Sequence, residues 1–192
     1  MKRYCKNVDI TDRDFISIAV RDCIKKKLSR KDTIELFCQY SGLPYNEIHR
    51  IVKHDYSNGY IDGLIETVID GIRQEIIYQS YVVKTIHYQT KIDGNSGKVR
   101  QIGIQDVKQQ LYDYIAAYGL WELFTAKIGY YQCSALENKG QIFGVKALKK
   151  WVDDHHISYA IQSDIRHFYD TIDIDALKDM LRRDVKNELL LH

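Results

Sequence analysis

The sequence predicts a mixed α/β chain of the α+β type, in which a helical N-terminal region is followed by a β-hairpin, further helices and a short strand. Three observations predict this class. Apolar residues recur at helical spacing over residues 1–80. The pattern changes at Tyr81, where β-branched and aromatic residues gather as they do in strands. Helical spacing returns near residue 106, and a single proline leaves long helices uninterrupted.

The composition is that of a globular chain with no marked excess of charge. With 192 residues, 45% of them apolar, the chain is long enough to bury a core. It has no apolar run of about 18 residues, so we expect no membrane-spanning helix, and no apolar stretch follows the basic start, so we expect no secretion signal. The four cysteines have no Cys-x-x-Cys spacing, which favours reduced thiols in the cytoplasm over a zinc or redox site. A net charge of +2 neither requires nor excludes a nucleic-acid partner.

Four helices are expected in the first predicted region, residues 1–80. Thr11 or Asp12 is placed to cap the first. A break at 41–44 and a turn at 57–59 set off the third and fourth. The apolar stripes are Phe15, Ile18, Ala19 and Cys23 in the first helix, Ile34, Leu36, Phe37 and Cys38 in the second, Ile48, Ile51 and Val52 in the third, and Ile61, Leu64, Ile65, Val68 and Ile72 in the fourth.

A β-hairpin is predicted over residues 81–104, at the start of the second region, residues 81–156. The outgoing strand is Tyr81–Lys91, the loop is Asp93–Gly97, and the returning strand is Lys98–Ile104. Two helices follow, one from Asp106 and one over Gly140–Val152. Their inward faces are expected to be Val107, Leu111, Tyr114 and Ile115 in the first, and Ile142, Val145, Leu148 and Val152 in the second.

The third predicted region, residues 157–192, begins with a short strand, Ile157–Gln162. Asp173 is placed to cap a last helix. That helix reaches the end of the sequence without a closing cap, which favours a chain cut from a longer protein. Its apolar residues are Leu177, Met180, Leu181, Val185 and Leu189.

The most informative local pattern surrounds Asp164. The short strand delivers Asp164 at its end, aromatic residues follow, and then come Asp170 and Asp173. A carboxylate held at a strand end suits a hard cation such as Mg²⁺. The alternative is that Asp164 only forms a turn or caps a helix, and the pattern taken alone favours this alternative.

The segment Asp164–Asp173 resembles motif A of reverse transcriptases, in which a strand ends in Asp and is followed by Ile, a basic residue, two aromatic residues and Asp-x-Ile-Asp. Upstream, Gly97–Ile104 resembles the fingers hairpin of the bacterial group II intron and retron-type enzymes. Ser134–Gln141 and Val145–Trp151 resemble the template-gripping segment and its helix. These motifs stand in the family's order over about residues 80–185, so the chain resembles the N-terminal part of an RNA-directed DNA polymerase.

The resemblance implies the fingers and the start of the palm of a right-hand polymerase. It implies that Asp164, helped by the backbone carbonyl of Ile165, is catalytic and holds Mg²⁺ ions. It implies that Tyr169 lies under the sugar of the incoming nucleotide and excludes a 2′-hydroxyl. The reaction would be attack of a primer 3′-hydroxyl on the α-phosphate of a dNTP, with an RNA template and a DNA primer as partners.

Cationic side chains complete the implied site. Arg100 would lie on the triphosphate of the dNTP, assisted by Lys98 or Lys84, because fingers cations offset its charge. The residues implied to contact nucleic acid are Lys139, Lys146, Lys149 and Lys150. Without the family argument, Lys146, Lys149 and Lys150 are best explained as the solvated face of a helix.

The sequence departs from the family pattern at three places. The family's Ile-Pro after the hairpin is Ile104-Gln105 here, and Cys133–Gly140 lacks the usual arginine of the template segment. No Tyr-x-Asp-Asp occurs, although that motif carries the other metal-binding Asp. We expect it downstream of His192, so we expect this fragment to be inactive alone.

Other interpretations stay open. A non-catalytic nucleic-acid-binding or phage-defence module that keeps the polymerase shape is the main alternative, and a purely structural helical domain is the second. Tyr130 and Tyr131 suit stacking on bases or packing in a core. The run Asp153–His156 is not expected to bind a metal, because adjacent residues at a helix end cannot all face one ion. The sequence predicts neither the oligomeric state nor the kind of mobile or antiviral element that the parent would serve.

Overall fold

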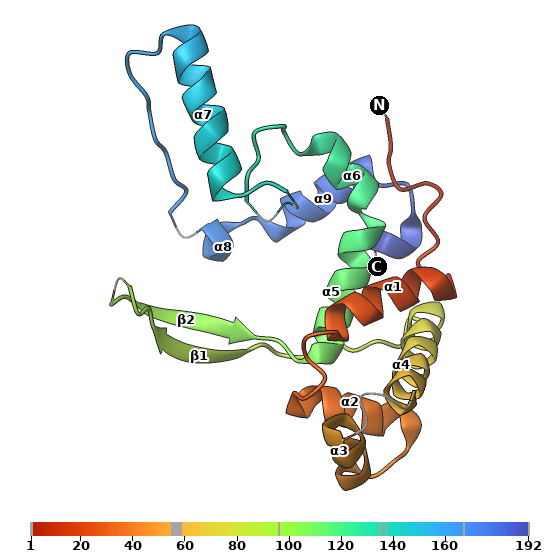
Figure 1. Ribbon diagram of the computed structural model, residues 1–192. Coiled ribbons are helices and arrows are strands. Elements are labelled where there is room, and N and C mark those ends of the chain that lie inside the picture. The colour runs from red at the N-terminus through yellow and green to blue at the C-terminus, as the bar shows by residue number, and fades with distance from the viewer. Residues whose placement is uncertain are drawn as a thin grey trace. The chain divides into compact units, whose positions relative to one another are not determined.

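The computed structural model of the chain describes residues 2–54, 59–95, 97–134, 136, 138–166 and 168–191 (Figure 1). In this part the chain is mostly helical and contains one two-stranded antiparallel sheet, so the predicted mixed α/β class is confirmed. The chain divides into two compact units: residues 7–120, and Trp121–Leu191 together with the residues up to Lys6. None of the described helices is both long enough and apolar enough to cross a membrane.

Five helices build the described part of the 7–120 unit. They are α1 Arg13–Ile24, α2 Lys31–Ser41, α3 Tyr45–His54, α4 Tyr60–Ile77 and α5 Val107–Gly119. The predicted cap of α1 is confirmed, because the Asp12 carboxylate accepts a hydrogen bond of 3.0 Å from the backbone N–H of Phe15. Gly42 ends α2 in the left-handed conformation, with φ of 73°.

The apolar faces of these helices meet in one core. α1 packs against α4 and α5, and α2 packs against α3, α4 and α5. The close approach of α2 to α4 depends on Gly71, because a Cβ there would overlap the ring of Tyr40. The core side chains without exposed surface include Ile16, Val20, Phe37, Ile48, Val68, Ile69, Ile72 and Leu111.

Most of the predicted stripes are confirmed, with one clear error in α1. Ile18 was expected to face the core, but 59% of its surface is exposed. α1 instead buries Ile16, Val20 and Ile24 together with Ala19 and Cys23. Both stripes fit helical spacing, and the packing against α4 and α5 selects the face that carries more branched side chains. The predicted turn at 57–59 lies largely outside the described residues.

A polar cluster borders the core between α2, α4 and α5. The Glu75 carboxylate accepts hydrogen bonds from Lys108 at 2.7 Å, from Tyr40 at 2.8 Å and from the Tyr112 hydroxyl. Burial by itself would raise the pKa of Glu75, but these three donors lower it below its ordinary value. The ring of Tyr81 packs on the ring of Tyr112 at 5.5 Å between centroids, so the cluster also anchors the segment that leads into the hairpin.

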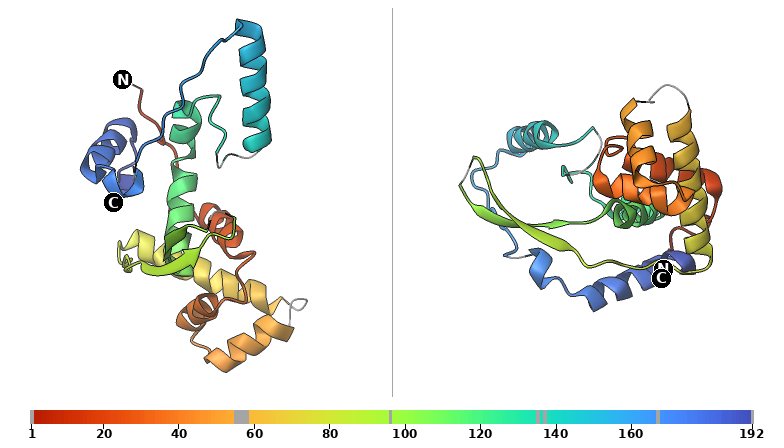
Figure 2. Two further views of the ribbon diagram at one scale, coloured as in Figure 1. Left: turned by 90° about the vertical axis from the view of Figure 1, so that its left-hand side faces the viewer. Right: turned by 90° about the horizontal axis from the view of Figure 1, so that it is seen from below.

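The hairpin consists of β1 His87–Ile92 and β2 Val99–Ile104, and it projects away from the five helices of its unit (Figures 1 and 2). The outgoing strand begins at His87 and not at Tyr81 as predicted. His87 pairs with Ile104, the last residue of β2, so residues before His87 have no partner strand. The turn is closed by hydrogen bonds of 2.8 Å between the backbones of Asp93 and Lys98 and of Gly97 and Asp93.

The other unit contains α6 Trp121–Lys127, α7 Gln141–His155, α8 Phe168–Thr171, α9 Ile174–Asp184 and the 3₁₀ helix η1 Glu188–Leu191. The predicted cap at Asp173 is confirmed by a 2.9 Å hydrogen bond from the Ala176 N–H. The N-terminal segment joins this unit, because the backbone of Tyr4 bonds to Asp184 at 2.8 Å and to Lys186 at 2.9 Å.

Three predictions for this unit are wrong. The strand expected at Ile157–Gln162 does not form: these residues are irregular, and Ile161 is 90% exposed. Strand pairing in the described part of the chain joins β1 to β2, and it does not include residues 157–162. The stripe of α7 does not face inward, since this helix buries none of its residues and Ile142 is 74% exposed. The last helix is also shorter than predicted: α9 ends at Asp184, so Val185 and Leu189 lie outside it, and Leu177 and Met180 are exposed.

Candidate functional site

The hairpin brings two basic side chains together on one face. In an antiparallel ladder, directly opposite residues point to the same side of the sheet. The register pairs Lys91 with Arg100, two residues from the turn, and both side chains are exposed. Like charges in directly opposite positions repel each other. An anion bound between Lys91 and Arg100 would remove this repulsion.

Arg100 is held by the turn of its own hairpin. Its Nη2 lies 3.3 Å from the Asp93 carboxylate, while 61% of its side chain remains exposed. A surface ion pair of this kind contributes little stability, about 0–1 kcal/mol. It orients the guanidinium without preventing a contact with a more strongly charged ligand.

Lys84 and Lys98, the two cations predicted to assist Arg100, lie in different places in the structure. Lys84 precedes β1, and its ammonium lies 2.6 Å from the Asp106 carboxylate. Asp106 also caps α5 by accepting a 2.8 Å hydrogen bond from the Gln109 N–H. Burial would raise the pKa of Asp106, but Lys84 and this N–H lower it on balance. Lys84 therefore stabilises the root of the hairpin, whereas Lys98 is an exposed residue of the turn.

Sequence reasoning missed Lys91. The predicted five-residue loop, Asp93–Gly97, would pair Ile92 with Lys98. In the structure, Ile92 pairs with Val99. A shift of one residue moves every side chain of a strand to the other face relative to its partner. The correct length of the turn would therefore have predicted that Lys91 lies opposite Arg100.

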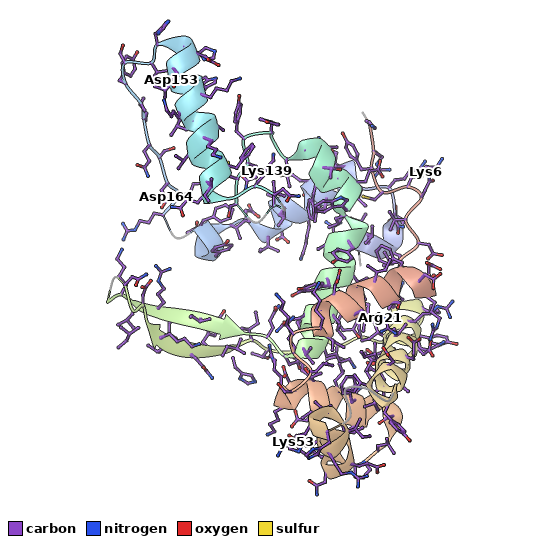
Figure 3. The ribbon with its side chains drawn as sticks, viewed as in Figure 1. Lys6, Arg21, Lys53, Lys139, Asp153 and Asp164 are labelled. Carbon is purple, nitrogen blue, oxygen red and sulfur yellow. The ribbon has the colours of Figure 1, made fainter. Side chains whose placement is uncertain are left out.

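In the other unit, Asp164 lies on the irregular segment that leads to α8, with its side chain exposed (Figure 3). Ile165 is 64% exposed, and Tyr169 of α8 is 90% exposed. In the described part of the chain no three His, Cys, Asp or Glu side chains lie close enough together to hold a metal ion. The side chain of Asp170 lies outside the described residues, and the Asp173 carboxylate caps α9. Asp164 and Ile165 are therefore exposed on an irregular segment, and the expectation that they hold Mg²⁺ stays a prediction.

The predicted nucleic-acid lysines lie on α7 and in the segment before it. Lys149 pairs with Asp153 at 2.7 Å and Lys150 with Asp154 at 3.8 Å, both as exposed pairs one helical turn apart. Lys146 has no ion-pair partner among the described residues. Since exposed pairs of this kind are weak, these cations remain available to phosphates.

Lys139, labelled in Figure 3, differs from these lysines because its ammonium lies over two aromatic rings. Its ammonium lies 4.8 Å from the centre of the Tyr130 ring and 5.2 Å from that of Phe143, and it donates a 2.5 Å hydrogen bond to the Tyr130 carbonyl. These cation–π contacts fix the two rings and the ammonium relative to each other.

An open groove of about 500 Å³ runs beside these residues. It is lined by Tyr130, Tyr131, Phe143, Lys146, Ala147, Lys150, Trp151, Asp154 and His155. Tyr130 and Tyr131 are 67% and 60% exposed, so the alternative that they pack in a core is wrong. Trp151 and Phe143 were missed, because the sequence does not reveal that residues 130–131 return to the side of α7.

The predicted site residues thus fall in both units: Arg100, Lys98 and Lys84 in one, and Asp164, Ile165, Tyr169 and the four lysines in the other. Comparisons with protein-family models, with curated proteins and with solved structures found no match. Functional inference therefore depends on the residues and motifs of this chain.

Proposed function

We propose that this chain is the N-terminal part of an RNA-directed DNA polymerase of the group II intron and retron-like type. It would supply the fingers and the first catalytic segment of the palm to an enzyme that adds dNTPs to a primer 3′-end on an RNA template. The observation that carries the proposal is the exposed hairpin, on which Lys91 and Arg100 lie directly opposite each other. This is the motif in which the resemblance to reverse transcriptases expects triphosphate-binding cations.

The chemistry of a triphosphate suits this face of the hairpin. A guanidinium presents a planar fork of donors to phosphate oxygens, and an ammonium acts as a compact positive charge beside it. Of the lysines near Arg100, Lys91 is the best second cation, because it shares the face of Arg100, whereas Lys84 is already paired with Asp106.

Asp164 and the carbonyl of Ile165 would hold Mg²⁺ in the palm. Mg²⁺ in phosphoryl-transfer sites commonly takes one or two carboxylates and completes its shell with waters and substrate phosphates. When bound, the ion offsets the negative charge of the phosphates. Tyr169, with 90% of its surface exposed, is free to lie against a nucleotide sugar and to exclude a 2′-hydroxyl.

The alternative is a non-catalytic nucleic-acid-binding or phage-defence module. The groove beside α7 favours it, because aromatic and lysine side chains bind a strand without any metal-holding carboxylate. The cytoplasm remains the proposed compartment under either function, and the four cysteines, all free thiols, are compatible with it.

Primer extension separates the two functions. In the whole polymerase that the proposal implies, Asp164→Asn abolishes incorporation of dNTPs, because an amide binds Mg²⁺ far less well than a carboxylate. Tyr169→Val keeps DNA synthesis and admits ribonucleotides. Neither change should lower the melting temperature, since both side chains are exposed. The present chain alone should incorporate nothing above a metal-free control. An Asp164→Asn enzyme with full activity would refute the polymerase proposal.

A further inference from the structure

The groove beside α7 has the chemistry of a stacking site. Tyr131 and Trp151 line it and keep 60% and 46% of their surface exposed. Exposed aromatic rings that share one hollow are unusual on a protein surface and mark binding sites. Its volume of about 500 Å³ lies within the range of about 300–1,000 Å³ that is typical of ligand sites.

The wall of the groove is held in place by specific contacts. Gly144 of α7 allows the segment at Cys133 to approach, since a Cβ at Gly144 would lie 3.2 Å from the Cys133 sulfur. The Tyr130 ring meets the Phe143 ring edge to face at 5.8 Å between centroids, and Lys139 lies over both. The residues next to Tyr131 are therefore fixed to α7, and the groove exists before a ligand arrives.

An apolar hollow of about 340 Å³ shares Tyr131 and Trp151 with the groove. Its other lining residues are Cys133, Gly144, Ala147 and Leu148. The two aromatic rings therefore offer apolar surface to a ligand in the groove, while the charged groups lie along one side of α7.

The charges of the groove select an anionic ligand. Lys146 and Lys150 stand one helical turn apart, and Lys139 adds a third cation beside Tyr130. One carboxylate, Asp154, also lines the groove and lies 3.8 Å from the Lys150 ammonium. The balance is positive, and flat apolar rings beside cations match a molecule that alternates planar bases with phosphates.

We propose that this groove binds unpaired nucleotides of single-stranded RNA, with one base stacked on Tyr131, another on Trp151, and neighbouring phosphates at Lys146 and Lys150. The inference deepens the proposed function and rests on it, because it names the place where a template-like strand is held. An unpaired strand is required, since the bases of a duplex already stack on one another and do not offer their faces.

Fluorescence anisotropy with the full chain and a labelled eight-nucleotide RNA tests the inference. Tyr131→Ala and Trp151→Ala should each weaken binding about tenfold, the expected loss for one base–aromatic stack. Trp151→Phe should restore most of the affinity, because it keeps an aromatic face. Tyr60→Ala is the matched control: Tyr60 is 61% exposed but belongs to α4, and this change should leave the affinity unchanged.

Salt and strand state provide two further readouts. Raising the salt concentration should weaken binding of the wild type steeply, since phosphate contacts release counterions. Lys146→Ala should reduce the steepness, whereas Tyr131→Ala should not. In a Trp121→Phe background, RNA should quench the fluorescence of Trp151, and a duplex of the same length should not. Helix α7 buries none of its side chains, and Tyr131 and Trp121 are 60% and 54% exposed, so these variants are expected to fold.

Three results would overturn the inference. RNA bound equally well by the wild type, Tyr131→Ala and Trp151→Ala would place the strand elsewhere and leave the polymerase proposal intact. Absence of RNA binding even at low salt would count against the groove and against any nucleic-acid function. Self-association that is lost in Trp151→Ala and is not competed by RNA would make the groove a protein interface instead.

Discussion

The helices α1 to α5 and the segment from α7 to α8 use apolar residues in opposite ways. In the first region, Phe37 and Val68 are completely buried, and helical spacing correctly predicts most buried positions. In the second region, Ile142 and Leu148 of α7 follow the same helical spacing but are exposed, and so is Ile161 of the irregular segment after α7. A periodic apolar stripe therefore predicts a helix reliably, but it predicts burial only where the chain provides another apolar face.

The largest effect that this comparison predicts is on stability. Phe37→Ala should lower the free energy of unfolding by about 3–5 kcal/mol, because it opens a cavity in a tightly packed core. Ile161→Ala should change it by less than about 0.5 kcal/mol, because 90% of that side chain is exposed. Denaturant unfolding measures both. Equal losses would show that the segment around Ile161 is packed in solution.

Two glycines of α4 sharpen the same comparison within one helix. Gly71→Ala should destabilise the protein by about 1–3 kcal/mol, since the new methyl group would overlap the Tyr40 ring. Gly63→Ala meets no neighbouring atom and should stabilise the protein by about 0.4–1 kcal/mol through a less flexible unfolded chain. Thermal unfolding of the two variants beside the wild type reports the opposite signs. Two shifts of the same sign would contradict the packing of α2 on α4.

The Glu75 cluster predicts a pH dependence with a defined sign. The folded-state pKa of Glu75 is lowered, so its contribution to stability is present above the unfolded pKa and is lost as the pH falls through the folded value. Glu75→Gln should destabilise the protein at pH 7 by about 1–3 kcal/mol, because it leaves Lys108 without its carboxylate partner. The difference between variant and wild type should shrink as the pH falls below the ordinary pKa of Glu, about 4.3, and through the lowered folded-state pKa of Glu75. If the difference in stability between Glu75→Gln and the wild type grows toward acid pH, the folded-state pKa of Glu75 is not lowered.

The hairpin predicts a small effect on stability. Lys91→Glu replaces a like-charged cross-strand pair with an opposite-charged one, and it should stabilise the strands by about 0.2–1 kcal/mol. The same change should remove triphosphate binding, because it places a negative charge where a phosphate is expected. Amide hydrogen exchange of residues 99–104 measures the stability. Faster exchange in the variant would show that Lys91 and Arg100 do not face each other.

Local patterns predicted those parts of the fold that local contacts determine. Capping by Asp12 and Asp173 follows from residue type and position, and the hairpin follows from its strand and turn residues. The prediction of a strand at residues 157–162 was wrong because a strand needs a partner strand, which the local sequence does not specify. For the candidate site, Arg100 was found from a motif, whereas Lys91 depends on a register that one residue of turn length decides.

The aromatic groove was harder to predict than either the caps or the hairpin. Its walls come from residues 130–131 and from the far end of α7 at Trp151, about twenty residues apart in the sequence. The close approach at Gly144 and the contact between the Tyr130 and Phe143 rings bring these segments together. A binding groove that depends on such a long-range contact cannot be predicted from the spacing of residues in the sequence.

Binding of a deoxynucleoside triphosphate with Mg²⁺ to the full chain, measured by titration calorimetry, tests the central claim most directly. The account predicts that the triphosphate binds more tightly than the monophosphate and that Arg100→Ala weakens its binding at least about tenfold, as expected for the loss of a hydrogen bond to a charged group. Lys91→Ala should act in the same direction, and Lys53→Ala, which removes an exposed lysine of α3, should have no effect. Equal binding of mono- and triphosphate, or an Arg100→Ala chain with unchanged affinity, would contradict the assignment of the hairpin as a nucleotide-binding element.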